Sequence, residues 1–304
     1  MSEALQSLLD LLDLERIEQD IFRGRSRSAV VPRVFGGQVA AQALVAAGRT
    51  VPEDRPAHSL HAYFLRPGDP GAPIVYKVDR LRDGRSFTTR RVVAVQHGKP
   101  IFGLSASFQR YEEGLEHQAP MPPAPDPATL PTGAERLSGY PHLDPDVVTR
   151  FLQARGAVDL RYVADPPFGS YGEPRDPHSQ VWFRTNGKLA DDPLLHVVLA
   201  TYVSDMTLLD SVLLAHGRGG WAVGDVVGAS LDHAMWFHRP FRADEWLLYD
   251  QHSPSAHGGR GLGQARIYTQ DGRLAISVIQ EGVVRVPREE RQDSGEEPRG
   301  SRED

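Results

Sequence analysis

The sequence predicts an α+β fold in which one unit, a helix followed by antiparallel strands, occurs twice. In both halves of the chain, a helix-like segment precedes strand-like segments that alternate polar and apolar residues and end in turn residues. A proline-rich segment, residues 118–133, separates the halves, and its prolines disfavour regular helix or central strand. We therefore expect two domains of similar structure.

The first unit starts at a glycine pair, Gly36 and Gly37, which opens the segment FGGQVAAQALVAAG. Its alanines allow strands to approach the helix axis closely, and Gly48 can end the helix in a left-handed conformation. This composition predicts a helix inside a curved sheet, with a surface helix as the alternative reading. The strands expected after it are residues 58–68, 72–84, 85–98 and 99–109.

The second unit repeats this order, with one long apolar helix expected at residues 193–214. Arg239 follows Arg66 by 173 residues, each just before a proline, and the turn residue Gly272 follows Gly98 by 174 residues. A nearly constant separation across strands and turns indicates internal duplication. The strands expected here are residues 230–240, 244–253, 261–272 and 273–284.

These patterns predict four segments along the chain. We expect an N-terminal domain at residues 1–117, a proline-rich linker at 118–140, a C-terminal domain at 141–286 and a disordered tail at 287–304. The tail is charged and lacks aliphatic residues, so it cannot bury enough surface to offset the cost of ordering. Near the N-terminus, leucines at 5, 8, 9 and 12 predict a short amphipathic helix, and its acidic start does not resemble a secretory signal.

Composition and charge exclude several classes of function. With 40% hydrophobic and 24% charged residues, the chain reads as globular, and no stretch reaches the ~20 apolar residues that cross a bilayer. A net charge of -6 argues against broad nucleic-acid binding. The absence of cysteine removes thiol nucleophiles and fits the cytoplasm, where we expect the protein. A phosphate-bearing small ligand remains possible, because arginines recur in both units, at positions 66, 85, 90, 91, 239 and 260.

Asp205 interrupts the apolar helix expected at residues 193–214. A carboxylate in such surroundings costs several kcal/mol unless a water, donor or ligand accompanies it. The alternative is that Asp205 lies with Ser204 on one solvated stripe of that helix. The sequence pattern does not decide between these two readings.

Ser230 and Gln280 are weaker candidates when taken alone. Alternation along a strand places Ser230 and Asp232 on one face and His233 on the other. Gln280 lies among aliphatic residues of the last strand, where a buried amide must find hydrogen-bond partners. Each residue also fits an ordinary structural role in a strand.

Other catalytic patterns are not supported. The histidine pairs 58/61 and 233/238 have odd separations, which places their members on opposite faces of a strand and disfavours a metal site. No Gly-x-Ser-x-Gly motif of serine hydrolases occurs. The glycine run HGGRGLG does not open a helix after a strand, so it does not indicate dinucleotide binding.

Several long segments, in order, together resemble the acyl-CoA thioesterase II family, also called the TesB type. The resemblance extends from the N-terminal helix to about Val286. The segments that carry it are FGGQVAAQAL, HSLHAYFLRPGD, LRDGRSFTTRRV, QVWFRTNG, LDHAMWFHRPF and TQDGRLAISVIQEG.

This resemblance implies a double hotdog fold, that is, two fused domains in which an antiparallel sheet wraps around a central helix. It also implies hydrolysis of acyl-CoA to free fatty acid and coenzyme A without a metal or organic cofactor. The family's water-activating residues fall on Asp205, Ser230 and Gln280 of this chain. The family carries a threonine or a serine at the position of Ser230, which keeps the hydroxyl but lacks the methyl group of threonine.

For substrate binding we expect contributions from residues in both units. Backbone N–H groups near the glycine pair at the helix start are candidates to stabilise the oxyanion. The residues assigned to substrate binding are Gly36, Gly37, His58, Arg91 and Arg260. By resemblance we also expect a homodimer or homotetramer.

Two other functions remain open from the sequence. A hotdog enzyme of the enoyl-CoA hydratase type would use an Asp and His pair, for which His58 or His233 could serve. A non-catalytic acyl-CoA-binding protein could keep the fold without turnover. Release of free thiol from a saturated acyl-CoA would separate hydrolysis from both.

Overall fold

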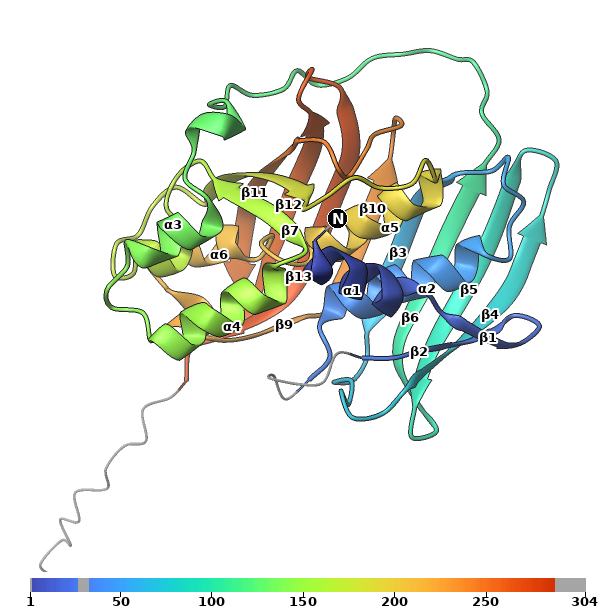
Figure 1. The fold of residues 1–304 in the computed structure, drawn as a ribbon, viewed down its shortest axis with the longest axis horizontal. Coiled ribbons are helices and arrows are strands. Elements are labelled where there is room, and N and C mark those ends of the chain that lie inside the picture. Colours follow the sequence, from blue (N-terminus) through green and yellow to red (C-terminus); the bar gives the residue numbers. More distant parts are fainter. Residues whose placement is uncertain (1, 27–32, 288–304) are drawn as a thin grey trace, which may run out of the picture.

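The computed structural model describes residues 2–26 and 33–287, so the tail expected at 287–304 falls almost wholly outside the described residues (Figure 1). Its helices are α1 (Glu3–Leu12), α2 (Gly36–Gly48), α3 (Gly133–Ser138), α4 (Pro145–Arg155), α5 (Pro193–Ser204) and α6 (Asp210–Leu214). Short 3-10 turns lie at Pro127–Thr129, Pro167–Gly169 and Gly220–Ala222. No helix of the described ranges is both long and apolar enough to cross a membrane.

The strands join into a single 13-stranded sheet. In the N-terminal half they are β1 (Glu15–Glu18), β2 (Ile21–Gly24), β3 (Ala57–Phe64), β4 (Ile74–Asp83), β5 (Phe87–Gln96) and β6 (Lys99–Gln109). In the C-terminal half they are β7 (Val158–Tyr162), β8 (His178–Thr185), β9 (Val227–Ser230), β10 (Asp232–Phe237), β11 (Leu247–His257), β12 (Arg260–Thr269) and β13 (Leu274–Arg285).

The order of these strands confirms the α+β class and the duplication. It runs β1-β2-β4-β5-β6-β3-β10-β13-β12-β11-β8-β7, with β9 beside β13. Read from either end, equivalent strands occur in the same sequence, and β3 meets β10 at the centre. There the two halves pair antiparallel, with Trp236 opposite Ser59 and Asp232 opposite Tyr63. One continuous sheet thus carries both repeats.

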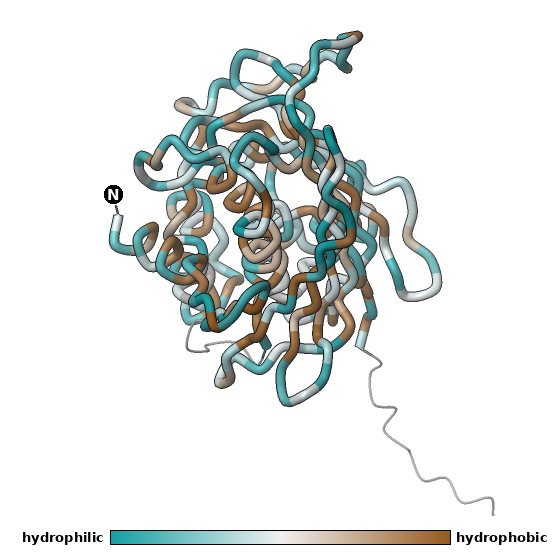
Figure 2. The backbone as a smooth tube through the Cα atoms, turned by 90° about the vertical axis from the view of Figure 1, so that its right-hand side faces the viewer, coloured by the Kyte–Doolittle hydropathy of each residue, from teal (hydrophilic) through white to brown (hydrophobic). Residues whose placement is uncertain are grey.

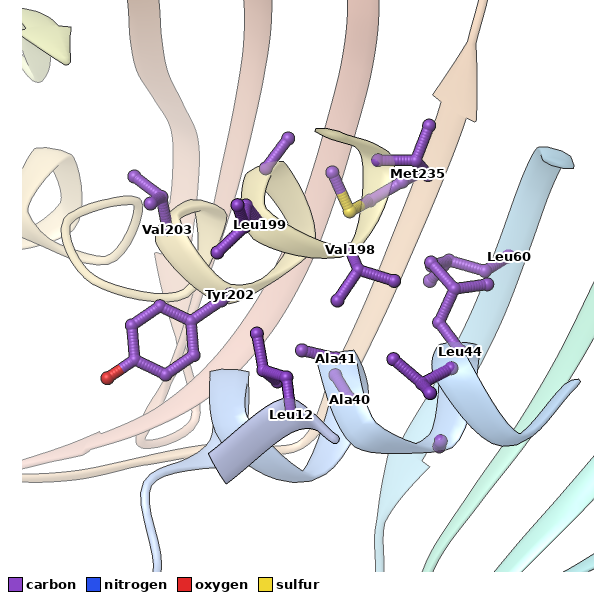
Figure 3. Packing of buried hydrophobic residues seen from close by; sticks show 14 of the residues in the cluster. Leu12, Ala40, Ala41, Leu44, Leu60, Val198, Leu199, Tyr202, Val203 and Met235 are labelled. Atoms are coloured by element: carbon purple, nitrogen blue, oxygen red, sulfur yellow. The ribbon is translucent and has the colours of Figure 1, made fainter. Parts of the chain in front are cut away.

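Helices α2 and α5 pack against each other within this curved sheet (Figure 3). Gly37 approaches the carbonyl of Tyr202, and Gly48 approaches Leu194, so the two helices run antiparallel. The alanines of α2 are almost completely buried, as expected for a central helix. The surface-helix reading is therefore wrong. Hydrophilic residues predominate in the outer parts of the chain, whereas hydrophobic residues predominate in its interior (Figure 2).

Gly48 has a different role from the one predicted. It is the last residue of α2 and does not have a positive φ. A Cβ at this position would lie 2.5 Å from the Leu194 Cδ2 atom, so glycine serves the contact between the helices. The N-terminal helix agrees with its prediction, because Leu5, Leu8 and Leu12 of α1 are buried in the main core.

The apolar segment 193–214 forms two helices instead of one. Helix α5 ends at Ser204, Asp205 is its C-cap, and α6 begins at Asp210. The phenol of Tyr249 donates a hydrogen bond to the Ser204 carbonyl at 2.9 Å, which satisfies a terminal acceptor of α5. The break allows the Asp205 side chain to leave the helix surface.

Loss of packing between α2 and α5 should destabilise the fold. Leu44 of α2 is completely buried, and shortening it to alanine should lower the free energy of unfolding by about 2–5 kcal/mol because a cavity remains. Urea denaturation of Leu44→Ala and of Leu115→Ala, whose side chain is fully exposed, would test this. Equal midpoints for the two variants would contradict the proposed packing.

Candidate active site

The carboxylate of Asp205 lies where the end of α5 meets the start of α2. Ser230 Oγ donates a hydrogen bond to Asp205 Oδ1 at 2.9 Å. Gln280 Nε2 donates to the same oxygen at 2.5 Å. The structure therefore brings together three residues that are far apart in the sequence and come from α5, β9 and β13. This arrangement excludes the reading in which Asp205 lies with Ser204 on a solvated stripe.

The glycine pair of α2 forms the opposite wall. A Cβ on Gly36 would lie 2.7 Å from Asp205 Oδ2 and 2.9 Å from the ring of Phe64. A Cβ on Gly37 would lie 2.5 Å from the Tyr202 carbonyl oxygen. Only glycine permits this close approach. The first amides of a helix have no intrahelical acceptor, and the N–H of Gly37 is directed at the Asp205 carboxylate.

Burial raises the pKa of Asp205 above its ordinary value of 3.8. The donors Gln280, Ser230 and the Gly37 N–H oppose this effect because they stabilise the ionised form. The residue as a whole is only partly covered, so solvent and ligands can approach it. A carboxylate with a raised pKa is a stronger base than a solvated aspartate, as a proton acceptor at neutral pH requires.

Two acceptors in the site remain available. Asp205 Oδ1 already accepts two hydrogen bonds, whereas Oδ2 faces Gly36. Gln280 is buried, and its Oε1 atom has no hydrogen-bond partner within the described chain. Buried polar atoms of this kind call for a ligand or a water. The site can therefore accept hydrogen bonds from a small donor beside the carboxylate.

The predicted orientation of His233 relative to Ser230 is wrong. Ser230 pairs with Gly282, but Ala234 pairs with Ile279, so one extra residue lies in the strand between these pairs. Such a bulge reverses the alternation of side chains. His233 consequently faces α5, on the same side as Ser230, and its Nε2 atom lies 2.8 Å from Ser204 Oγ.

Residues behind the trio hold the end of α5 in place. Ser204 receives contacts from the buried His233 ring and from the Tyr249 hydroxyl. Burial lowers the pKa of His233 to about 4, so the ring is neutral at pH 7. In the following turn, Gln251 Nε2 donates to Thr207 Oγ1 at 2.9 Å. These contacts fix the position from which Asp205 projects.

The other residues assigned to substrate binding lie away from the trio. His58 stands at the far end of β3 from Phe64, about 20 Å along the strand, and contacts Ser107 at 2.8 Å. Arg91 and Arg260 lie on the outer face of the sheet and pair with Asp79 and Glu281. Their part in substrate binding remains a prediction.

Sequence reasoning missed the aromatic residues around the glycine pair. The rings of Phe35 and Tyr202 meet edge to face at 5.2 Å, and Phe35 also packs against Gly37. Phe64 is held by a backbone hydrogen bond to Leu231, next to Ser230. The phenylalanine directly before the glycines was the only signal available from the sequence.

A protein-family model described as acyl-CoA thioesterase matches residues 154–283, and one described as acyl-CoA thioesterase N-terminal domain matches residues 25–109. Human acyl-coenzyme A thioesterase 8 is 43% identical over 91% of this chain and 88% of its own length. Acyl-CoA thioesterase 2 of Haemophilus influenzae is 41% identical over 94% of this chain and 99% of its own.

Solved structures agree with these sequence matches. Acyl-CoA thioesterase II TesB2 from Mycobacterium marinum superposes with a TM-score of 0.76, at 45% identity, covering 92% of this chain and 98% of that one. The tesB protein of Mycobacterium avium subspecies paratuberculosis also gives 0.76, at 32% identity, over 92% and 99%. The fold is thus the double hotdog, and the chain is a thioester hydrolase.

This chain belongs to the acyl-CoA thioesterase II family, the TesB type.

The close approach of Gly36 to Asp205 can be tested by adding one methyl group. In Gly36→Ala the new carbon must displace either the carboxylate or the Phe64 ring, so we expect kcat/KM for thioester hydrolysis to fall at least about tenfold. Gly103→Ala is the matched control, because a Cβ there meets no atom within 4 Å. Unchanged activity in Gly36→Ala, with an unchanged melting temperature, would contradict the geometry.

Proposed function

We propose that this protein hydrolyses acyl-CoA to a free fatty acid and coenzyme A through a water activated by Asp205, Ser230 and Gln280. The observation that carries the proposal is the convergence of Ser230 and Gln280 on a single oxygen of a partly buried carboxylate. Family membership supports the substrate class, because the relatives are named acyl-CoA thioesterases.

Each member of the trio has a distinct chemical task. Ser230 and Gln280 hold Asp205 Oδ1, which leaves Oδ2 free to accept a proton. A water that donates one hydrogen to Oδ2 and the other to Gln280 Oε1 satisfies both free acceptors. Its oxygen lone pair then faces the site and can attack a thioester carbonyl, so general-base catalysis replaces a covalent nucleophile.

The reaction balances without an additional reactant. The water oxygen bonds to the thioester carbonyl carbon while Asp205 takes one proton. Amides at the start of α2 are suited to stabilise the oxyanion, because the helix N-terminus carries partial positive charge. Collapse of this intermediate breaks the C–S bond, and the proton held by Asp205 passes to the departing thiolate.

The hydratase alternative receives no support from the two candidate histidines. His58 contacts Ser107, and His233 contacts Ser204, so in the described chain neither is hydrogen-bonded to a carboxylate. Burial also lowers the pKa of both rings, that of His233 to about 4. The trio at Asp205 is therefore the better candidate for chemistry.

Removal of the base should abolish turnover while binding persists. We expect Asp205→Asn to lower kcat at least about 100-fold, because an amide cannot take the proton of water. Free thiol released from a saturated acyl-CoA measures the rate, and calorimetry measures binding of the same substrate to the variant. Asp250→Asn serves as the control, because this aspartate of β11 is hydrogen-bonded to His178 and Gln180 and not to the trio. Full activity in Asp205→Asn would exclude Asp205 as the base, whereas binding without turnover by the wild-type protein would leave only the non-catalytic binding function.

Ser230→Ala should move the pH profile in a defined direction. Activity requires ionised Asp205, so kcat/KM falls as the pH drops through the Asp205 pKa, which burial has raised. Without the serine hydroxyl the ionised form loses a donor, so the pKa rises further and the acid limb shifts to higher pH. Ser107→Ala, which removes a hydroxyl bound to His58, should leave the limb in place.

Comparison of Ser230→Ala with Asp205→Asn also tests whether Ser230 is a nucleophile. If water is the attacking group, Ser230→Ala retains activity at pH values above its shifted acid limb. An acyl-serine mechanism predicts instead a loss as deep as that of Asp205→Asn at every pH. That outcome would overturn the proposed role of water.

A further inference from the structure

An open cleft lies at the C-terminal end of α2, the end remote from Gly36. It has a volume of about 450 Å³ and is lined mainly by arginines and by the turn after the helix. The charged residues that line it are Arg49, Arg55, Arg80, Arg90 and Asp83. Since α2 spans Gly36–Gly48, the cleft is about 18 Å from the glycine pair along the helix. It is therefore separate from the site at Asp205.

The duplication shows that this end of the molecule cannot repeat the chemistry at Asp205. Arg49 is the C-cap of α2, as Asp205 is the C-cap of α5. Ala57 pairs with Phe108 in the way that Ser230 pairs with Gly282, so alanine replaces the serine. By the same register, Ala106 occupies the position of Gln280. The carboxylate, hydroxyl and amide are all replaced, and the base is replaced by a cation.

The charge of the cleft favours an anion. Four guanidinium groups face one carboxylate among its lining residues. Arg80 is the largest cause of the lowered pKa of Asp20, and Arg90 and Arg16 add to the effect. A lowered carboxylate pKa reports positive potential.

One of the four arginines is structural, and the other three have N–H groups that make no hydrogen bond within the described residues. Arg90 is buried, and its guanidinium donates to Thr50, Arg82, Thr89 and Asp83, which uses its N–H groups. Within the described residues, Arg49 and Arg80 each retain N–H groups that make no hydrogen bond, and Arg55 Nε has no hydrogen-bond partner. These donors are available to a ligand.

We propose that this cleft is a second binding site, for a ligand that carries a diphosphate group. Guanidinium groups bind phosphate oxygens through paired hydrogen bonds, and several phosphate oxygens can engage three arginines at once. A volume of about 450 Å³ exceeds the need of a single phosphate and lies within the range for small-molecule ligands. Inorganic pyrophosphate and nucleoside diphosphates share this chemistry.

Existing ion pairs do not block such a ligand. The partner of Arg49, Asp13, keeps 75% of its side-chain surface exposed, whereas the partner of Arg80, Asp20, keeps 19%. The Arg49–Asp13 pair is exposed and contributes little to stability, so a multivalent anion can displace Asp13. Arg80 can stay paired with Asp20, because within the described residues its Nη1 group makes no hydrogen bond. The cleft therefore needs only side-chain movement to accept the ligand.

Calorimetry on the whole protein at low salt would test the proposal with pyrophosphate, ADP and adenosine as probes. The variant Arg49→Gln/Arg80→Gln removes two cations without touching the structural Arg90. We expect wild type to bind pyrophosphate or ADP, and the double variant to bind at least about tenfold more weakly. Arg273→Gln is the matched control, because Arg273 is also paired with an aspartate but lies outside the cleft. It should bind like wild type.

Comparison of pyrophosphate with ADP separates a site for any diphosphate from a site for a nucleotide. Equal affinity for pyrophosphate and ADP identifies the diphosphate as the whole determinant, and tighter binding of ADP identifies a nucleotide site. Thioesterase activity of the double variant, expected to equal that of wild type, reports that it is folded. No binding by wild type, equal binding by wild type and the double variant, or binding of adenosine with the affinity of ADP would overturn the proposal.

Discussion

The antiparallel contact between α2 and α5 is the constraint on which the structure depends. It places the first amides of one helix against the last residue of the other, so a carboxylate at the C-cap of α5 meets Gly37. The approach is possible because α2 presents glycine and alanine where longer side chains would hold the helices apart. The curved sheet around both helices then supplies Ser230 and Gln280 from adjoining strands.

Duplication creates two such helix junctions, and the sequence has made them different. At one end stand Asp205, a hydroxyl and an amide, whereas the equivalent positions at the other end hold Arg49 and two alanines. Hydrogen-bond acceptors without a partner lie at the first end, whereas arginines line an open cleft at the second. A single fold thus offers two chemically opposite environments about 18 Å apart along α2.

Much of the fold followed from local patterns. Alternation identified the strands from β3 to β6 and from β10 to β13, and their constant spacing revealed the repeat. Strands β1, β2, β7, β8 and β9 were missed, because most of them are short and their pairing, rather than a strong pattern, defines them. The break at Asp205 was also missed, since the Tyr249 hydroxyl that accompanies it comes from a distant strand.

The sequence by itself determined the class of fold and the duplication and, through long motifs, selected Asp205, Ser230 and Gln280 as candidate site residues. Only the tertiary structure decided that these side chains share one oxygen, that Gly36 leaves room for it, and that a bulge turns His233 toward Ser204. The physical reason is that periodicity within a segment reports which face is buried. Distances between side chains depend on how separate segments pack, and His58 and Arg91 show that membership of the right strand does not place a residue in the site.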